Sequence, residues 1–144
     1  MRRDVFVLPP SLPVLDAVRE LLQRGFSGAP VVERGVLVGV FSERDALTAI
    51  AASHYEDEPP GTVAQHMRRE YAVVGATTDL YEVASLFRES PIRRVPVVDL
   101  ARRLLGILSR GDVLKALVSQ FPNRQKTQYE KLQDHMALRL GASF

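Results

Sequence analysis

The segment LVGVFSERDALTAI at residues 37–50 is repeated as LLGILSRGDVLKAL at residues 104–117. Each copy begins with an apolar run that contains one glycine, a pattern typical of a buried strand. Each copy then passes through Ser-x-x-Asp into a segment whose apolar residues recur at helical spacing. The repeat therefore predicts a strand that leads directly into a helix, twice in one chain.

The repeat also includes the beginning of each copy. MRRDVFVL at residues 1–8 aligns with MRREYAVV at residues 67–74, and Pro-Val-Val occurs at residues 30–32 and again at residues 96–98. One extra residue falls in the polar turn after the second Pro-Val-Val, and a turn is where a duplicated unit tolerates an insertion. The chain is therefore interpreted as a tandem duplication.

Both copies have the same predicted order of elements, β-α-β-β-α. The predicted strands span residues 5–8, 71–74, 36–41 and 104–108, with two more that open at Val31 and Val97, and the predicted helices span 14–22, 80–87, 43–52 and 110–120. Because neither copy can cover its own sheet, the two are expected to pack face to face around one core. The predicted fold class is α/β (α+β), with tandem repeats related by a pseudo-two-fold axis.

The expected domain boundaries follow from the repeat. The first repeat spans residues 1–56, an acidic and Pro-rich linker spans 57–66, the second repeat spans 67–121, and a helical tail spans 122–144. An apolar stripe marks the tail, at Tyr129, Leu132, Met136 and Leu140. Such a stripe indicates a helix that docks on the module or on a second subunit, or a segment that binds another protein or an anionic surface.

The composition is that of a soluble globular protein, with 46% hydrophobic and 25% charged residues. The apolar runs are far too short to span a membrane, and the chain has no cysteine, which excludes disulfides and thiolate metal sites and fits the cytoplasm. The net charge is only +2, and acidic residues lie among the basic ones, which argues against nucleic-acid binding.

Catalytic and metal-binding motifs are not evident. The three histidines, His54, His66 and His135, are far apart in sequence and lack the spacing of metal ligands. There is no Walker-type loop and no Gly-x-Ser-x-Gly turn. We therefore expect no metal, no cofactor and no enzymatic activity.

The Ser-x-x-Asp motifs allow two interpretations. Serine before a helix, with an acidic residue three positions later, forms a capping box that satisfies free amides at the helix start. The same position also suits a nucleotide, because the helix N-terminus attracts phosphate and an ionised Asp accepts hydrogen bonds from the two hydroxyls of a ribose. The two roles fall on Ser42 with Asp45, and on Ser109 with Asp112.

The surroundings of these motifs resemble a known family. FSGAPVVE at residues 26–33 and IRRVPVVD at residues 92–99, each followed by a Gly-containing strand and Ser-x-x-Asp, are similar to the cystathionine β-synthase (CBS) domain. The resemblance covers residues 1–121 in two copies, and it implies a pseudo-two-fold CBS domain pair with two clefts that bind an adenine nucleotide.

The resemblance also implies roles for individual residues. The aspartates would hold the ribose and the serines would reach phosphate, while the stretch before Pro-Val-Val would line the adenine. The implied ligand-binding residues are Asp45, Ser42, Phe26, Ser27 and Ala29 in the first copy, and Asp112, Ser109, Ile92, Arg93, Arg94, Val95 and Pro96 in the second. Arg94 is expected to reach phosphate.

The two copies differ at this basic position. The first has Ser27-Gly28 where the second has Arg93-Arg94, although Arg44 offers a possible replacement for the missing charge. We therefore expect the second cleft to bind nucleotide more tightly. The leading hypothesis is a non-catalytic regulatory module that binds AMP, ADP or ATP, forms a homodimer and regulates an enzyme or transporter. The alternatives are a ligand-free dimerisation module, or a sensor of S-adenosylmethionine or NAD.

Overall fold

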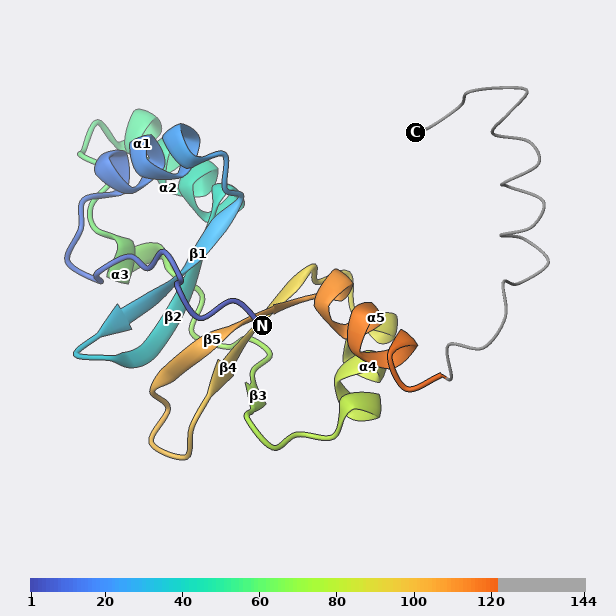
Figure 1. Cartoon of the computed structure of the whole chain (residues 1–144). Helices are drawn as coiled ribbons and strands as arrows, with labels where there is room; N and C mark the ends of the chain where they lie inside the picture. The colour runs from blue at the N-terminus through green and yellow to red at the C-terminus, as the bar shows by residue number, and fades with distance from the viewer. Residues whose placement is uncertain (122–144) are drawn as a thin grey trace, which may run out of the picture.

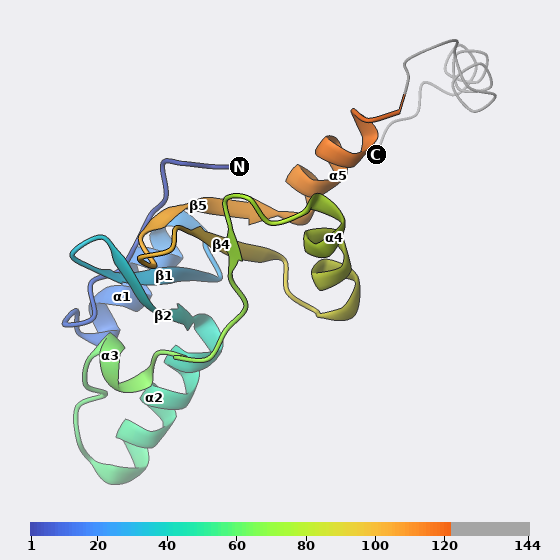
Figure 2. The same ribbon diagram turned by 90° about the horizontal axis from the view of Figure 1, so that it is seen from below.

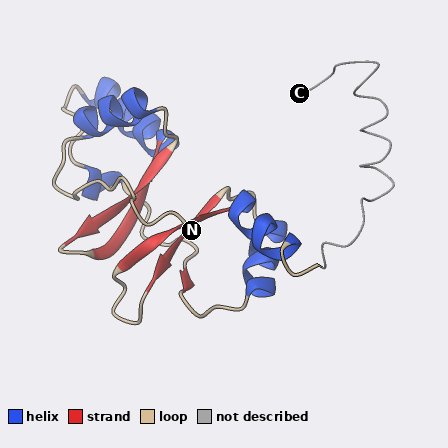
Figure 3. Ribbon diagram, in the orientation of Figure 1, coloured by secondary structure: helices blue, strands red, loops and turns tan. Residues whose placement is uncertain are grey.

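The computed structural model describes residues 1–121, which form two similar units (Figure 1). In each unit a β-hairpin faces the middle of the molecule and a pair of helices lies on its outer side (Figure 3). The first unit contains α1 (Val14–Arg24), β1 (Gly28–Glu33), β2 (Val36–Ser42) and α2 (Glu43–Glu56), followed by the short helix α3 (Val63–His66). The second contains β3 (Val74–Gly75), α4 (Leu80–Glu89), β4 (Arg94–Val98), β5 (Leu104–Ser109) and α5 (Arg110–Val118).

The strands that open each repeat are shorter than predicted. In the segment 5–8 only Leu8 pairs with a strand, in parallel with Val31, and the second repeat forms β3 only at Val74–Gly75. Pro9 has no amide hydrogen to extend the first ladder. Two further differences concern helices: α2 continues to Glu56, and the segment predicted as linker contains α3, whose Val63 is fully buried.

All of the buried hydrophobic residues in the described chain except Leu37 and Val98 fall into two clusters, one on each hairpin, so the expectation of one shared core is wrong. The first cluster has 11 buried residues, among them Phe41, Leu21 and Val63, and the second has six, among them Phe87 and Val95. Each hairpin is covered by the helices of its own repeat, and the first core also takes in Val63 of α3 and Met67, which opens the second repeat.

The repeats are joined by main-chain hydrogen bonds that obey a pseudo-two-fold relation. At the centre, the amide of Leu37 donates to the carbonyl of Arg102 over 2.9 Å, and the amide of Leu104 donates to the carbonyl of Gly35 over 3.1 Å. These two bonds are equivalent, because Leu37 aligns with Leu104 and Gly35 with Arg102 at an offset of 67 residues. The axis therefore passes between Val36 and Arg103, which form a bridge.

The Met-Arg-Arg segments cross between the repeats. Arg2 of the first repeat exchanges two hydrogen bonds with Ile107 on β5, at 3.0 and 2.9 Å. Arg68 of the second repeat exchanges two hydrogen bonds with Val40 on β2, at 2.8 and 3.0 Å. The segment that opens each repeat therefore completes the sheet of the other one, as seen from below in Figure 2 near the N-terminus.

A glycine permits each crossing. A Cβ atom on Gly106 would lie 2.6 Å from the carbonyl oxygen of Arg2, and one on Gly39 would lie 2.5 Å from the sulfur of Met67. Both distances are shorter than any ordinary van der Waals contact. The Gly in each repeated strand is therefore explained by the close approach of the crossing segment.

Candidate functional site

Both Ser-x-x-Asp motifs form capping boxes at the start of a helix. At α2, the amide and hydroxyl of Ser42 each donate to Oδ2 of Asp45 over 2.9 Å, and the amide of Asp45 donates back to the Ser42 hydroxyl over 3.3 Å. At α5, the amide of Ser109 donates to Oδ2 of Asp112 over 2.9 Å, and the Asp112 amide donates to the Ser109 hydroxyl over 3.1 Å. The capping role is therefore real in both repeats.

The capping boxes use only part of each carboxylate. Among residues 1–121, hydrogen bonds reach Oδ2 of Asp45 and Oδ2 of Asp112, and none reaches Oδ1 of either side chain. Both aspartates are partly exposed. An ionised carboxylate has about four acceptor positions, so each retains the capacity to accept hydrogen bonds from a ligand.

The residue before each inner strand is held against the helix start. The amide of Glu43, the first residue of α2, donates to the carbonyl of Ser27 over 2.9 Å, and the equivalent amide of Arg110 donates to the carbonyl of Arg93 over 3.3 Å. This first amide is therefore occupied in both helices. Anions at these helix starts would have to use side chains and the remaining amides.

The strand register brings the basic residues of the second repeat to the capping box. Arg94 is paired with Ser109 across β4 and β5, and Arg93 precedes it, with both arginines exposed. In the first repeat the residue paired with Ser42 is Gly28, and a Cβ there would lie 3.0 Å from the carbonyl oxygen of Phe41. The first repeat therefore has neither the charge nor the room for a side chain at this position.

The apolar residues expected to line an adenine lie mostly in the cores. Ala29, Val95 and Pro96 are buried, so their side chains are committed to packing within the repeats. Phe26 is half-buried and packs on Phe6 with ring centroids 5.9 Å apart. Half-buried Ile92 packs against the second core, whereas Ser27 and Arg44 are exposed.

Asp112 lies in a positive environment. The amide hydrogen bond from Ser109 is the largest of the effects that lower the pKa of Asp112 below its ordinary value, although partial burial opposes it. The Ser109 hydroxyl, the N-terminal ammonium of Met1 and Lys115 lower the pKa further. The two hydrogen bonds of Arg2 to Ile107, two residues before Ser109, hold the crossing N-terminal segment near the second helix start.

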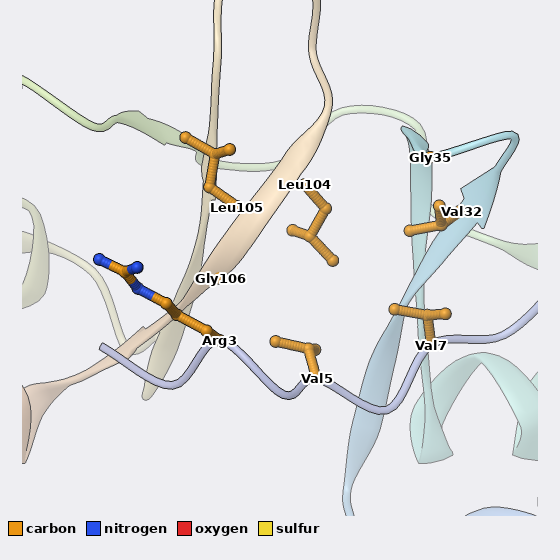
Figure 4. A pocket seen from close by; sticks show the side chains of 8 residues that line it. All are labelled: Arg3, Val5, Val7, Val32, Gly35, Leu104, Leu105 and Gly106. Carbon is orange, nitrogen blue, oxygen red and sulfur yellow. The ribbon is translucent and has the colours of Figure 1, made fainter.

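A cavity of ≈ 200 Å³ lies between the crossing N-terminal segment and the hairpins (Figure 4). Its walls come from both repeats and are formed by Arg3, Val5, Val7, Val32, Gly35, Leu104, Leu105 and Gly106. None of the residues expected from the sequence lines it. The repeated Met-Arg-Arg was the available signal for these residues, but the sequence does not reveal that this segment crosses to the other repeat.

Comparison with protein families agrees with this geometry. A family model described as the CBS domain matches residues 1–52 and 63–119. The chain belongs to the CBS domain family. The family model matches twice, so the chain carries a tandem pair of CBS repeats, and the second match begins at α3, which packs on the first unit of the structure.

Solved structures similar to this CBS pair have the same fold. The structure of CBSX2 in complex with AMP is 33% identical, with a TM-score of 0.70, and the match covers 83% of this chain and 91% of that chain. CBSX2 is a CBS domain-containing protein of Arabidopsis thaliana. MJ1225 of Methanocaldococcus jannaschii is 27% identical with a TM-score of 0.68, over 81% of this chain and 45% of that one.

Among curated proteins, the CBS pair matches parts of longer chains. An uncharacterized protein of Methanocaldococcus jannaschii, MJ1232, is 26% identical over 87% of this chain and 40% of its own length. Inosine-5'-monophosphate dehydrogenase of Streptococcus pyogenes is 31% identical over 90% of this chain but only 25% of its own length. The likeness to this enzyme therefore concerns a quarter of it.

The described part of the chain has neither a cluster of metal ligands nor a membrane-spanning helix. No group of three or more His, Asp or Glu side chains in residues 1–121 is placed to hold a metal ion. Within the same residues, no helix has the length and apolar character needed to cross a membrane. The helical tail predicted for residues 122–144, including His135, lies outside the described residues.

Proposed function

We propose that this CBS pair is a non-catalytic regulatory module that binds an adenine nucleotide, with the tighter site at the start of α5. The observation that carries the proposal is the combination of an Asp112 carboxylate with one oxygen free of protein hydrogen bonds and two exposed arginines, Arg93 and Arg94, on the paired strand. A ribose with its phosphate offers two hydroxyl donors and one anion, which are complementary to these groups.

In the proposed site the capping box and the ligand share Asp112. Oδ2 continues to accept the amide hydrogen bond of Ser109, and Oδ1 accepts the ribose hydroxyls. The phosphate pairs with Arg94, which lies across the strand pair from Ser109. The two interpretations of Ser-x-x-Asp are therefore compatible, since different oxygens of one carboxylate serve them.

The first cleft is proposed to bind more weakly. Asp45 presents the same free Oδ1, but Ser27 and Gly28 stand where the second repeat has its arginines, and Arg44 on α2 is the nearest replacement in sequence. A phosphate there would lose one or two charge-assisted hydrogen bonds, each of which contributes roughly 1.5–3 kcal/mol.

The choice of an adenine nucleotide is supported by CBSX2, which was crystallised with AMP and is 33% identical over most of both chains. S-Adenosylmethionine and NAD also contain an adenosine ribose, and they remain alternatives. The basic pair Arg93-Arg94 favours a phosphorylated ligand over S-adenosylmethionine, which lacks phosphate.

A second candidate function is a dimerisation module without ligand. Large apolar side chains are exposed on the helices, including Leu47 at 70% on α2, and Leu114 at 60% and Val118 at 66% on α5. Such side chains suit a homodimer interface. We propose a homodimer in either case, located in the cytoplasm, that regulates a partner enzyme or transporter.

Thermal melting separates the two functions. A ligand at about one hundred times its Kd should stabilise the protein by about 2.7 kcal/mol and raise Tm by several degrees. AMP, ADP, ATP, NAD and S-adenosylmethionine are compared with CMP as a control that has ribose and phosphate but no adenine. A shift with an adenine nucleotide that Asp112→Asn abolishes supports the proposal. A dimer whose Tm responds to none of these compounds would leave the dimerisation function.

A further inference from the structure

The short helix α3 covers an exposed backbone edge of the first repeat, at the beginning of α1 (Figure 2). The amides of Val63 and Ala64 donate to the carbonyls of Leu12 and Pro10 over 2.8 and 2.9 Å, and the amide of Val14 donates to Gly61 over 2.9 Å. The Val63 side chain is fully buried in the first core. The cover therefore satisfies polar groups at the helix start and also completes the core.

The equivalent edge of the second repeat has no such cover within residues 1–121. The repeat aligns Pro10, Leu12 and Val14 with Ala76, Thr78 and Leu80, and no described segment hydrogen-bonds to the carbonyls of Ala76 and Thr78 or to the amide of Leu80. Val14 is fully buried, whereas Leu80 is only half-buried and the adjacent Tyr81 is 62% exposed. The second repeat thus presents an open site for the element that covers the first.

The sequence contains another copy of that element. VAQHM at residues 63–67 aligns with LQDHM at residues 132–136, and His-Met occurs at these two places alone in the chain. The alignment puts Leu132 at the position of Val63 and Gln133 at that of Ala64. This copy follows α5 in the chain, just as α3 follows α2.

We propose that the segment Leu132–Met136 docks on the open edge of the second repeat, in the place that α3 takes on the first. Leu132 fills the position of Val63 beside Thr78 and Leu80, and the amides of the segment donate to the carbonyls of Thr78 and Ala76. The connection is long enough, because 13 residues, 119–131, separate the end of α5 from Leu132, whereas the equivalent stretch of the first repeat, residues 52–62 before α3, has 11.

Docking of the whole motif brings the tail into competition with the N-terminal segment. In the first repeat, Met67 follows α3 and packs against Gly39 of β2. The matching position for Met136 is beside Gly106 of β5, where Met1 and Arg2 already lie. The tail and the segment Met1–Arg3 therefore exclude one another at Gly106. Because Arg3 and Val5 line the inter-repeat cavity, an exchange would also change the wall of that cavity.

Cross-linking of paired cysteines tests the docking, since the natural chain contains none. Ala76→Cys with Gln133→Cys is treated with a short bismaleimide in the full chain, and Pro10→Cys with Ala64→Cys serves as the positive control, because these residues are in contact. We expect a cross-link within one chain, reduced about tenfold by Leu132→Asp and unchanged by Leu140→Asp. A yield that Leu132→Asp leaves unchanged, or a cross-link only between two chains, would overturn the proposal.

The competition has its own test in the same protein. Arg2→Pro removes the amide that donates to Ile107 and so loosens the N-terminal segment. We expect this change to increase the rate of cross-linking between positions 76 and 133. Asp4→Asn, close to the same hydrogen bonds but with its backbone amide intact, serves as the control. An unchanged rate in Arg2→Pro would show that the tail docks without displacing the N-terminal segment.

Discussion

The two CBS repeats share the main-chain contacts that join them but differ in the length of their helices and in their side chains. The crossing bonds at Arg2 and Arg68, the central bonds between the hairpins and both capping boxes recur one for one. The first core nevertheless has 11 buried residues and the second has six, while the exposed arginine pair belongs to the second repeat alone. The duplication therefore preserved the framework in both copies, with the larger core in one and the charge suited to an anion in the other.

The largest difference between the repeats is expected at the two crossing glycines. Gly39→Val forces a side chain against Met67 and Arg68, which lie in the middle of the chain and cannot leave, since Met67 is only 9% exposed. Gly106→Val displaces Met1 and Arg2, which are held by the two bonds to Ile107 and can lift away. We expect losses of about 3 and about 1 kcal/mol in the free energy of unfolding, measured by urea denaturation.

A double variant controls for the effect of valine in a strand. Met67→Ala makes room for the new side chain, so Gly39→Val with Met67→Ala should cost less than the sum of the two single changes. Equal losses at Gly39 and Gly106 would show that the crossing segments are held equally tightly in both repeats, and strict additivity of Gly39→Val and Met67→Ala would show that the new valine does not meet Met67.

The second difference concerns ligand affinity. Asp112→Asn should lower nucleotide affinity at least about tenfold, because Asn offers one acceptor oxygen and its NH₂ cannot accept from a ribose hydroxyl. Asp45→Asn should cause a smaller loss, measured by calorimetry on both variants. A 2′-deoxynucleotide should lose affinity for the natural protein and much less for Asp112→Asn, because groups that interact directly are coupled in a double cycle. If Asp45→Asn is the more damaging change, the ranking of the two clefts is wrong.

At the capping serines we expect smaller losses of stability, and losses that differ less between the two repeats. Ser109→Ala and Ser42→Ala each remove a side-chain cap and should cost about 1 kcal/mol in unfolding free energy. The loss at Ser42 should be the greater, because its hydroxyl also donates to Oδ2 of Asp45 over 2.9 Å. The exposed Ser11 provides the control in Ser11→Ala. A serine whose removal costs no more than this control does not stabilise its helix.

The sequence predicted the repeat, the order of the elements and both capping boxes, because each depends on local spacing and on residues that recur. It did not predict the crossing of Met-Arg-Arg, since either a self-contained or an exchanged arrangement gives the same repeat. The sequence also did not predict that Ala29 and Val95 are buried, because alternation along a strand does not tell which of its two faces packs on the core. The separate cores follow from the helices, which cover each hairpin independently.

The smallest expected effect is on the pH dependence of stability, at Asp112. The Ser109 amide is the main cause that lowers the pKa of this carboxyl in the folded protein, so the folded state releases its proton more readily than the unfolded state. Its contribution is complete above the unfolded value of about 3.9 and is lost as the pH falls through the lower folded pKa. The free energy of unfolding should therefore be higher for the natural protein than for Asp112→Asn. This difference should be largest near neutral pH and should narrow below about pH 4. The same gap measured between Ser109→Ala and Asp112→Asn should narrow less as the pH falls. Ser109→Ala loses the hydroxyl that helps to lower the pKa of Asp112 but keeps the amide donor. Urea denaturation between pH 7 and 3 measures the gap, and a gap that stays constant across this range would mean that the Ser109 amide does not favour the ionised carboxylate. The effect is small because water screens a partly exposed charge, and it would distinguish the second repeat by the same Ser109–Asp112 pair that is proposed to hold its ligand.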